Sequence, residues 1–336
     1  MKGFVAFGEI MLRLTPSKQR DKLLLANEFS VGYAGAESNV AVSLARLGNQ
    51  TTFISKVPQN PMGQAALLGL QKFGISTDKV LHGGSRMGTY FIELGSSIRP
   101  SRVVYDRAGS AIADIKSDEF DWKTILKNKK WLHLSGITPA LSNQCAKETV
   151  LAAQTAKELG VRVSFDLNFR RTLWSDKKVA RAIFDKIIAC SDVIFANLGA
   201  LEDVYDLQFS GTDAVERTKN AMLKANTFFN VDNLAFTIRE HQSASQNKLQ
   251  GMAMQKGKIV SSKSYDIPVE GRFGTGDAFA AAYLHALDKN WELNKAIEFA
   301  AAAFALKHTI KGDLHTSSEE EIFSIMNGDL SGHVIR

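Results

Sequence analysis

Short apolar runs alternate along the chain with segments in which apolar residues recur every three or four positions. The runs predict strands over residues 4–7, 52–57, 131–134, 161–166, 192–196 and 234–238. The longer periods predict helices over residues 38–47, 63–73, 146–159, 178–189, 214–225, 277–287 and 294–308, several of them closed by a glycine. This alternation favours an α/β fold with a mainly parallel sheet covered by helices on both faces. We expect one such domain to take up residues 1–336.

The helical rhythm is interrupted between residues 83 and 114. Residues 88–94 and 102–105 are typical of strands joined by a turn-rich segment, and residues 12–14 and 29–33 are short and strand-like as well. These pieces predict a small β-subdomain, built from about residues 10–36 and 83–114, that is inserted into the α/β core. A small sheet needs a cover for its apolar face, so we interpret it as a lid or as the contact of a homodimer or higher homo-oligomer.

Composition and charge exclude several other classes of protein. The chain has 336 residues, 45% hydrophobic and 23% charged, which is typical of a soluble globular protein and not of a disordered chain, a collagen or a disulfide-rich miniprotein. The net charge of +6 is dispersed, so nucleic acid is not expected as a partner. No apolar run approaches the ~20 residues that span a bilayer, so no membrane partner is expected.

The cysteines and histidines bear on the compartment and on metals. Cys145 and Cys190 are the two cysteines, and they form no Cys-x-x-Cys pair, which favours a reducing, cytoplasmic setting. The short apolar run at the N-terminus is interrupted by Glu9, so no signal peptide is expected. The seven histidines show no pair at metal-ligand spacing, which argues against a structural zinc site.

The strongest chemical signal is a glycine-rich segment, Gly-Arg-Phe-Gly-Thr-Gly-Asp, at residues 271–277. Its glycines allow tight turns and let backbone N–H groups approach a ligand, and the alanine-rich helix that follows offers a positive dipole end that suits phosphate. Asp277, in the first turn of that helix, is suited to accept the proton of a hydroxyl group that attacks phosphorus.

A purely structural interpretation of this segment stays open on the residues alone. Asp277 could cap the helix, and the glycines could simply make a turn. The segment is neither a GxGxxG sequence after the first strand nor a Walker GxxxxGK[ST] sequence. A nicotinamide-dependent dehydrogenase and a Walker-type ATPase are therefore not favoured.

Two segments carry a resemblance to a known family. Residues 274–279 resemble the C-terminal signature of the ribokinase-like (PfkB) carbohydrate kinases, and residues 32–41 with 44–48 resemble the N-terminal sugar-binding signature of that family. The resemblance covers essentially the whole chain in the expected order. Within that family, the chain resembles the 2-keto-3-deoxygluconate kinases most of all. The segments that carry this resemblance are residues 35–37, 104–111, 165–170, 173–174, 237–240, 243–245, 307–309 and 312–313.

The resemblance implies a ribokinase-like three-layer αβα fold with a β-lid, ATP as donor, Mg²⁺ as companion ion and transfer of the γ-phosphate to a sugar hydroxyl. It implies that Asp277 is the catalytic base and that the backbone of Gly274, Thr275 and Gly276 forms the anion hole. The implied substrate-binding residues are Gly35, Ala36, Asn39, Tyr90, Tyr105, Arg107, Asn168 and Arg170. The implied nucleotide-binding residues are Thr237, Arg239, Ser243, Ser245, Gly274, Gly276 and His308.

Two arginines favour an acidic sugar on chemical grounds. A keto-deoxy sugar acid carries a carboxylate, which a guanidinium group binds through two parallel hydrogen bonds, whereas a neutral sugar needs no such partner. Arg107 ends a predicted lid strand, and Arg170 follows an Asp-x-Asn sequence at a strand end, where open α/β sheets bind ligands. The alternatives are a solvated surface charge for each arginine, a packed strand aromatic for Tyr90, a helix-start residue for Asn39 and a polar loop for residues 237–245.

Two positions depart from the family pattern. Gly271 stands where the family usually has an acidic residue, with Glu270 one place earlier. Ala200 stands where the family often has a glutamate near the phosphates and Mg²⁺, with Glu202 two places later. Either glutamate could replace the missing one, so we assign no metal ligand from the sequence.

The sequence thus predicts an ATP-dependent kinase that phosphorylates 2-keto-3-deoxygluconate. A kinase of another sugar, such as fructose or 2-keto-3-deoxygalactonate, is the first alternative, because the two keto-deoxy acids differ only in the direction of one hydroxyl group. A non-catalytic sugar-binding relative is the second alternative, prompted by Gly271 and Ala200, although the intact Asp277 argues against it.

Overall fold

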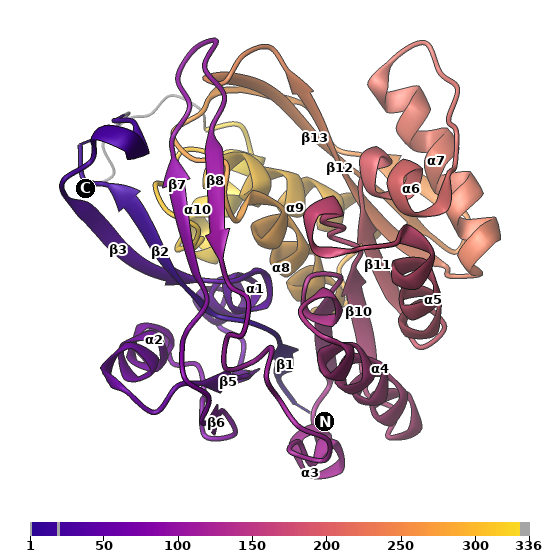
Figure 1. Ribbon diagram of the computed structural model, residues 1–336. Helices are drawn as coiled ribbons and strands as arrows, with labels where there is room; N and C mark the ends of the chain where they lie inside the picture. The colour runs from indigo at the N-terminus through magenta and orange to yellow at the C-terminus, as the bar shows by residue number, and fades with distance from the viewer. Residues whose placement is uncertain (1, 19–20, 330–336) are drawn as a thin grey trace.

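The computed structural model describes residues 2–18 and 21–329, and its centre is a nine-stranded sheet (Figure 1). The strands of this sheet are β1 (Phe4–Phe7), β4 (Thr51–Ile54), β9 (Trp131–Ser135), β10 (Arg162–Asp166), β11 (Val193–Ala196), β12 (Asn233–His241), β13 (Gln246–Gln255), β14 (Lys258–Ser261) and β15 (Tyr265–Pro268). They follow the order β14-β13-β12-β11-β10-β9-β1-β4, and β15 pairs with β13.

The neighbouring strands from β4 through β1, β9, β10 and β11 to β12 run parallel. Every residue of β1, β4, β9 and β11 is buried, because helices cover both faces of the sheet and only continuous apolar runs tolerate that environment. Strands β13, β14 and β15 extend the edge in the antiparallel sense. The predicted mainly parallel sheet is confirmed, with an antiparallel edge that the sequence did not predict.

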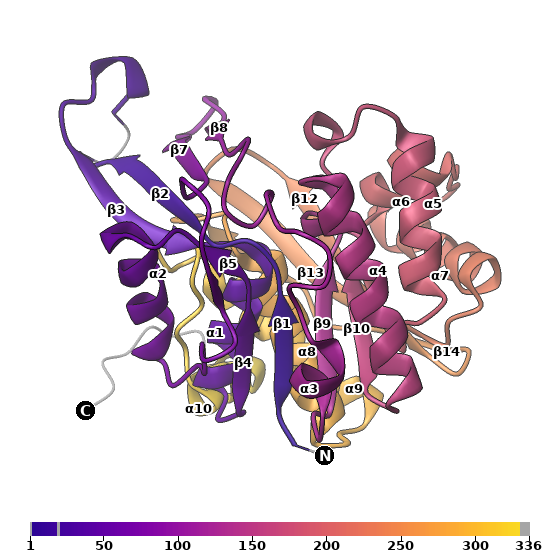
Figure 2. The same ribbon diagram turned by 60° about the horizontal axis from the view of Figure 1, so that its bottom comes forward.

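Helices lie on both faces of this sheet (Figure 1 and Figure 2). They are α1 (Ala36–Arg46), α2 (Pro61–Gln71), α3 (Trp122–Leu126), α4 (Asn143–Glu158), α5 (Lys177–Ile188), α6 (Leu198–Tyr205), α7 (Ala214–Phe229), α8 (Thr275–Asp288), α9 (Leu293–Lys307) and α10 (Glu319–Met326), with short 3-10 helices at Leu23–Leu25, Thr138–Ala140 and Arg171–Leu173. One apolar core lies between the sheet and helices α1, α8, α9 and α10. A second apolar core lies on the other face of the sheet, beneath helices α3, α4, α5, α6 and α7. Within the described ranges, no helix is long and apolar enough to span a membrane.

A smaller four-stranded sheet stands beside the main sheet, and we call it the lid (Figure 1 and Figure 2). Its strands are β2 (Met11–Pro16), β3 (Phe29–Ala34), β7 (Thr89–Glu93) and β8 (Arg102–Asp106), in the order β3-β2-β7-β8. All four lie within the two segments predicted for an inserted sheet. The remaining strands, β5 (Lys56–Val57) and β6 (Leu81–His82), form a separate parallel pair.

The lid contacts the main domain at the tip of its β7–β8 hairpin. The N–H of Ser97 donates to Oγ of Ser245 (2.9 Å), and the N–H of Ala244 donates to the carbonyl oxygen of Ser97 (2.8 Å). The predicted lid segment ends earlier than expected, since Ile112 is 2% exposed and packs in the core of the main sheet. Residues after β8 therefore return to the main domain before residue 114.

Candidate active site

A cleft of about 650 Å³ lies between the lid and the main sheet. Strands β10 and β11 reach it with their carboxyl ends, at Asp166 and Ala196, and the lid contributes Tyr90 and Tyr105. Open α/β sheets bind their ligands at these strand ends, and the volume is that of a site for small molecules. The cleft is therefore where the predicted chemistry has to be tested.

We call residues 271–277 the anion loop, because the sequence predicts that they bind phosphate. They lead into α8, and residues 272–277 line the cleft. Gly274 is the N-cap of that helix and has φ 72°, in the left-handed region that favours glycine. A Cβ at this position would lie 1.8 Å from the carbonyl oxygen of Asp313. No side chain caps α8, so its first N–H groups are available to an anion.

Asp277 lies in the first turn of α8 and faces the N-terminal part of α1. Nδ2 of Asn39 donates to Oδ2 of Asp277 (2.7 Å), which fixes the carboxyl group in the cleft. Burial raises the pKa of Asp277 to about 8, and the negative charges of Asp166, Asp313 and Glu37 act in the same direction. Because Gly274 is the N-cap and no side chain caps α8, the interpretation of Asp277 as a helix cap is wrong.

Two arginines lie beside the anion loop and line the same cleft. Nη2 of Arg239 donates to Oγ1 of Thr275 (2.7 Å), and Nη2 of Arg272 donates to the carbonyl oxygen of Ser243 (2.6 Å). Burial lowers the pKa of Arg239 to about 10, and the positive charge of Arg272 lowers it further. Two neighbouring guanidinium groups together with free helix N–H groups suit a polyphosphate.

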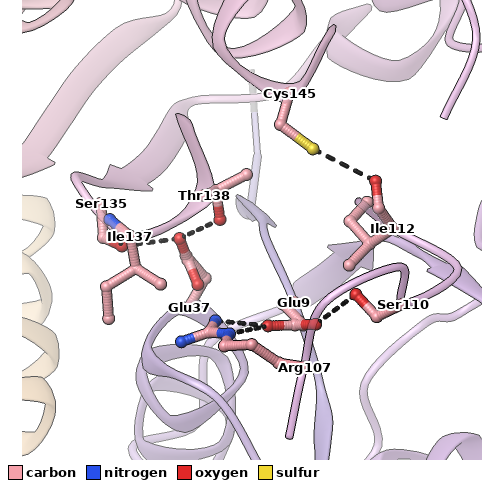
Figure 3. Close-up of polar contacts among 9 residues, drawn as sticks. All are labelled: Glu9, Glu37, Arg107, Ser110, Ile112, Ser135, Ile137, Thr138 and Cys145. Carbon is pink, nitrogen blue, oxygen red and sulfur yellow. Dashed lines mark hydrogen bonds and ion pairs between the residues drawn. The ribbon is translucent and has the colours of Figure 1, made fainter. Parts of the chain in front are cut away.

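A buried polar cluster joins the lid to the start of the cleft (Figure 3). Nε of Arg107 donates to Oε2 of Glu9 (2.9 Å), and Oγ of Ser110 donates to Oε1 of Glu9 (2.6 Å). Beside this pair, Oε1 of Glu37 accepts hydrogen bonds from Oγ of Ser135 and Oγ1 of Thr138, both at 2.7 Å. The guanidinium group of Arg107 is thus neutralised by a carboxylate of the protein itself.

Asp313 forms a second link between lid and main domain. Its Oδ2 accepts a hydrogen bond from the hydroxyl group of Tyr90 (2.7 Å), and its Oδ1 lies 3.0 Å from Nε of Arg13. Tyr90 and Arg13 belong to the lid strands β7 and β2. Because Asp313 also lines the cleft, the lid is anchored directly beside the anion loop.

Comparison with known proteins decides the family. The family described as pfkB family carbohydrate kinase matches residues 1–319. The chain belongs to the PfkB family of carbohydrate kinases. It is 32% identical to a 2-dehydro-3-deoxygalactonokinase of Haloferax volcanii, over 98% of each chain.

Solved structures of PfkB relatives share this fold. The crystal structure of a 2-dehydro-3-deoxygluconokinase from Thermotoga maritima matches with a TM-score of 0.94 and 40% identity, over 98% of this chain and 100% of that chain. A structure from E. coli, solved in complex with ATP and Mg²⁺, matches with a TM-score of 0.80 over 97% and 99%, and at 19% identity it shows the fold alone. The predicted ribokinase-like fold and the assignment to the carbohydrate kinases are confirmed.

This PfkB kinase brings most of the predicted site residues into one cleft. Those that line it are Gly35, Ala36, Asn39, Tyr90, Tyr105, Arg107, Asn168, Arg170, Thr237, Arg239, Gly274, Thr275, Gly276 and Asp277. They come from the lid, from α1, from the ends of two strands and from the anion loop. Their individual roles as ligands stay predictions, whereas their convergence is a property of the fold.

Three predicted nucleotide-binding residues lie outside the cleft lining. His308 is fully buried, with Nδ1 2.7 Å from the carbonyl oxygen of Phe304, so its ring faces the protein interior. Oγ of Ser243 accepts the N–H of Ser245 (3.0 Å), and Oγ of Ser245 accepts the N–H of Ser97 in the lid (2.9 Å). Their side chains bond within the protein, and their roles in nucleotide binding stay predictions.

The two predicted sugar-acid arginines differ in how free they are. Arg107 is 8% exposed and paired with Glu9, whereas Arg170 is exposed and its guanidinium donates only to the carbonyl oxygen of Phe169 (3.3 Å) among the described residues. The positive charge of Arg170 lowers the pKa of Asp166, which burial raises to about 6. Arg170 is therefore the guanidinium group that is free to bind a substrate carboxylate.

Neither nearby glutamate takes the place of the missing acidic residues. Glu202 pairs with Arg217 (3.2 Å), Glu270 is exposed, and neither lines the cleft. A Cβ at Gly271 would lie 2.7 Å from the carbonyl oxygen of Ile310, so this backbone leaves no room for a larger residue there. The departure at residue 271 is therefore built into the packing of the anion loop.

ATP and Mg²⁺, the two predicted cofactors, differ in how well the residues of the cleft suit them. Arg239, Arg272 and the free N–H groups of α8 suit the phosphates of ATP. The described residues hold no group of three or more His, Cys, Asp or Glu side chains that could bind a metal. No residue is therefore assigned to Mg²⁺, which in kinase sites is bound largely through substrate phosphates and water.

Sequence reasoning missed six charged residues of the site. The charged residues that line the cleft, although none was predicted to bind or to act, are Glu9, Glu37, Asp166, Asp203, Arg272 and Asp313. Glu37, Asp166 and Asp313 lie inside segments that carried the family resemblance, which was the available signal. Glu9 gave none, because its partner Arg107 is 98 residues away along the chain.

We predict that kcat/KM for the sugar falls as the pH drops below about 8. The pKa of Asp277 is raised to about 8, so below this pH its carboxyl group is protonated and accepts no proton from the substrate. In the limiting case the fall is tenfold per pH unit. The profile is measured by ADP release with the sugar well below its KM. A flat profile between pH 6 and 8, or the same fall in Asp277→Asn, would contradict the assignment of this limb to Asp277.

Proposed function

We propose that this carbohydrate kinase transfers the γ-phosphate of ATP to the hydroxyl group of 2-keto-3-deoxygluconate that is most distant from its carboxylate. The observation that carries the proposal is the position of Asp277, at an uncapped helix N-terminus, in the same cleft as the unpaired guanidinium group of Arg170. The kinase chemistry and the acid recognition are thereby brought into one volume. The names of the two relatives above, both kinases of 2-dehydro-3-deoxy sugar acids, support the same substrate class.

In this proposal the substrate carboxylate binds Arg170, with Tyr105 and Arg107 beside it. Asp277 accepts the proton of the distal hydroxyl group as the hydroxyl oxygen bonds to the γ-phosphorus, while the bond from that phosphorus to the β–γ bridging oxygen breaks and ADP leaves. The N–H groups of Gly274 to Asp277 and the guanidinium group of Arg239 stabilise the charge on the transferred phosphoryl group. Mg²⁺ bound to the phosphates of ATP supplies further neutralising charge.

2-Keto-3-deoxygluconate and 2-keto-3-deoxygalactonate share every chemical feature used above. One of the relatives is a 2-dehydro-3-deoxygalactonokinase. A panel of the two acids and fructose, with ADP measured chromatographically at saturating Mg-ATP, separates the alternatives. We expect turnover of at least one acid and preference for it over fructose. Preference for fructose would exclude an acid-specific kinase, and binding of a sugar without ADP release would favour a non-catalytic protein.

We predict that Arg170→Ala raises KM for the sugar acid by at least ~10-fold, the value of one lost hydrogen bond to a charged group. The kcat value, and any turnover of fructose, should change little, because in this proposal the guanidinium group contacts only the carboxylate. Arg102→Ala is the control, since Arg102 is exposed on β8 and does not line the cleft. An unchanged KM in Arg170→Ala would contradict the carboxylate assignment.

Two further parts of the proposal concern assembly and compartment. The exposed apolar residues Leu24, Leu25, Val31, Ile98 and Val104 lie in the lid segments, which supports the predicted homo-oligomer through this sheet. Cys145 and Cys190 are free thiols, which supports the predicted cytoplasmic setting. Both stay predictions.

A further inference from the structure

A fully buried lysine lies behind the anion loop. Lys307 is the last residue of α9, and its exposed fraction is 0%. Its Nζ donates to the carbonyl oxygens of Ile310 (2.9 Å) and Gly312 (2.8 Å). Both partners are therefore backbone carbonyls of one short turn, residues 308–313, which we call the support turn.

Retaining a cation at this depth is costly. Burial lowers the pKa of Lys307 to about 8, and the charge of Arg13 acts in the same direction, whereas the negative charges of Asp313 and Asp277 oppose them. None of the reactions described above has given this group a role.

The support turn is in backbone contact with the anion loop. The carbonyl oxygen of His308 accepts the N–H groups of Glu270 (2.9 Å) and Gly271 (3.0 Å). A Cβ at Gly271 would lie 2.7 Å from the carbonyl oxygen of Ile310, and one at Gly274 would lie 1.8 Å from that of Asp313. The carbonyl oxygens of Ile310 and Gly312, which converge on the ammonium group of Lys307, would repel each other without a donor between them. A shift of the support turn would therefore shift the anion loop.

We propose that Lys307 is a built-in monovalent cation that positions the anion loop for phosphoryl transfer. Its ammonium group holds the carbonyls of Ile310 and Gly312 together, and the turn that they define supports Gly271 and Gly274 from behind. Lys307 contacts no substrate, so it is a positioning residue and not a catalytic one. The proposal rests on the chain being a sugar kinase and not on which sugar it takes, because variants are compared on whichever sugar the wild type phosphorylates.

The first test uses the wild-type protein. We call the space between the carbonyl oxygens of Ile310 and Gly312 the carbonyl cage. If the ammonium group of Lys307 fills this cage, turnover needs no added K⁺, Na⁺ or NH₄⁺. ADP is therefore measured chromatographically, without coupling enzymes, in tetramethylammonium salts and in KCl at equal ionic strength. We expect the two kcat values to agree within about twofold. The loss of a single oriented hydrogen-bond donor lowers kcat by much more than that. A requirement of the wild type for a small monovalent cation would overturn the proposal.

The second test removes the ammonium group. Lys307→Met keeps most of the apolar stem and should lower kcat by ~10- to 100-fold with little change in either KM, the pattern of an interaction that matters in the transition state. Addition of K⁺ or NH₄⁺, which can enter the carbonyl cage, should restore part of the lost kcat. Lys186→Met is the control, because it makes the same change at an exposed position of α5.

The outcomes of the second test separate positioning from mere packing. Partial rescue by K⁺ or NH₄⁺ but not by tetramethylammonium, which is too large for the cage, supports the proposal. A kcat equal to that of Lys186→Met overturns it, and so does a loss that no cation restores and that matches a loss of thermal stability. If Lys307→Met does not fold, the salt dependence of the wild type decides. Failure to find any phosphorylated sugar acid would instead overturn the proposed substrate.

Discussion

Asp277→Asn is expected to bind sugar and ATP and to phosphorylate the sugar at least ~100-fold more slowly than the wild type. The asparagine oxygen still accepts the hydrogen bond from Nδ2 of Asn39, so the cleft keeps its shape, but the amide takes up no proton. Steady-state ADP release gives kcat, and calorimetry with each substrate gives binding. Near-normal turnover would remove Asp277 from the mechanism.

The same variant should be more stable than the wild type at pH 8 and above. An aspartate whose pKa rises from 3.8 in the unfolded chain to about 8 in the folded one carries a penalty that is absent below pH 4, grows as the pH rises and is complete above about pH 8. Asparagine removes that penalty, so we expect a melting temperature higher by ~2 °C or more. Asp232→Asn, at an exposed turn, is the control. A variant that loses both activity and stability would indicate a structural role for Asp277.

Gly274→Ala is expected to lower kcat by ~100-fold or more, because the anion loop loses the orientation of its N–H groups. The new Cβ would lie 1.8 Å from a backbone oxygen, and the left-handed φ of 72° adds ~1–3 kcal/mol of strain, so the loop has to move. Thermal unfolding and ADP release measure the two effects separately.

Gly276→Ala is the matched comparison two residues later. Apart from its chain neighbours and the nearby backbone of its own helix, no atom of the described residues lies within 4 Å of a Cβ at Gly276, so this variant should unfold at the temperature of the wild type. Any activity that it loses reflects crowding of the bound phosphates and not a displaced backbone. Equal stability of the two alanine variants would contradict the close packing of Gly274 against the support turn.

The pattern of the sequence was sufficient for the buried parts of the fold. Strands such as β1 and β11 are apolar at every position, and helices such as α4 end just before a glycine, so local signals and tertiary packing agree there. The antiparallel edge was missed because β13 is polar over most of its first half and β14 is a short edge strand with polar ends, which removes the apolar contrast that marks a strand.

The site was predictable where one short segment carries the chemistry. The anion loop contains its own glycines and its own acid, so the resemblance and the physical reasoning pointed to the same residues. Relations between distant segments were not predictable, as the Glu9–Arg107 pair demonstrates. Lys307 shows the same limit, because a lysine in the last turn of a helix ordinarily faces solvent, and only the packing of the support turn buries it.

The tip of the β7–β8 hairpin, at Ser97, is held to the main domain by a weak contact. Two hydrogen bonds, each worth ~0.5–1.5 kcal/mol, hold this tip against residues 244–245, and Ser97 itself has a positive φ of 53°. Parting the tip from residues 244–245 therefore costs only ~1–3 kcal/mol at this contact. The tip can thus separate from the main domain without breaking any hydrogen bond of the main sheet.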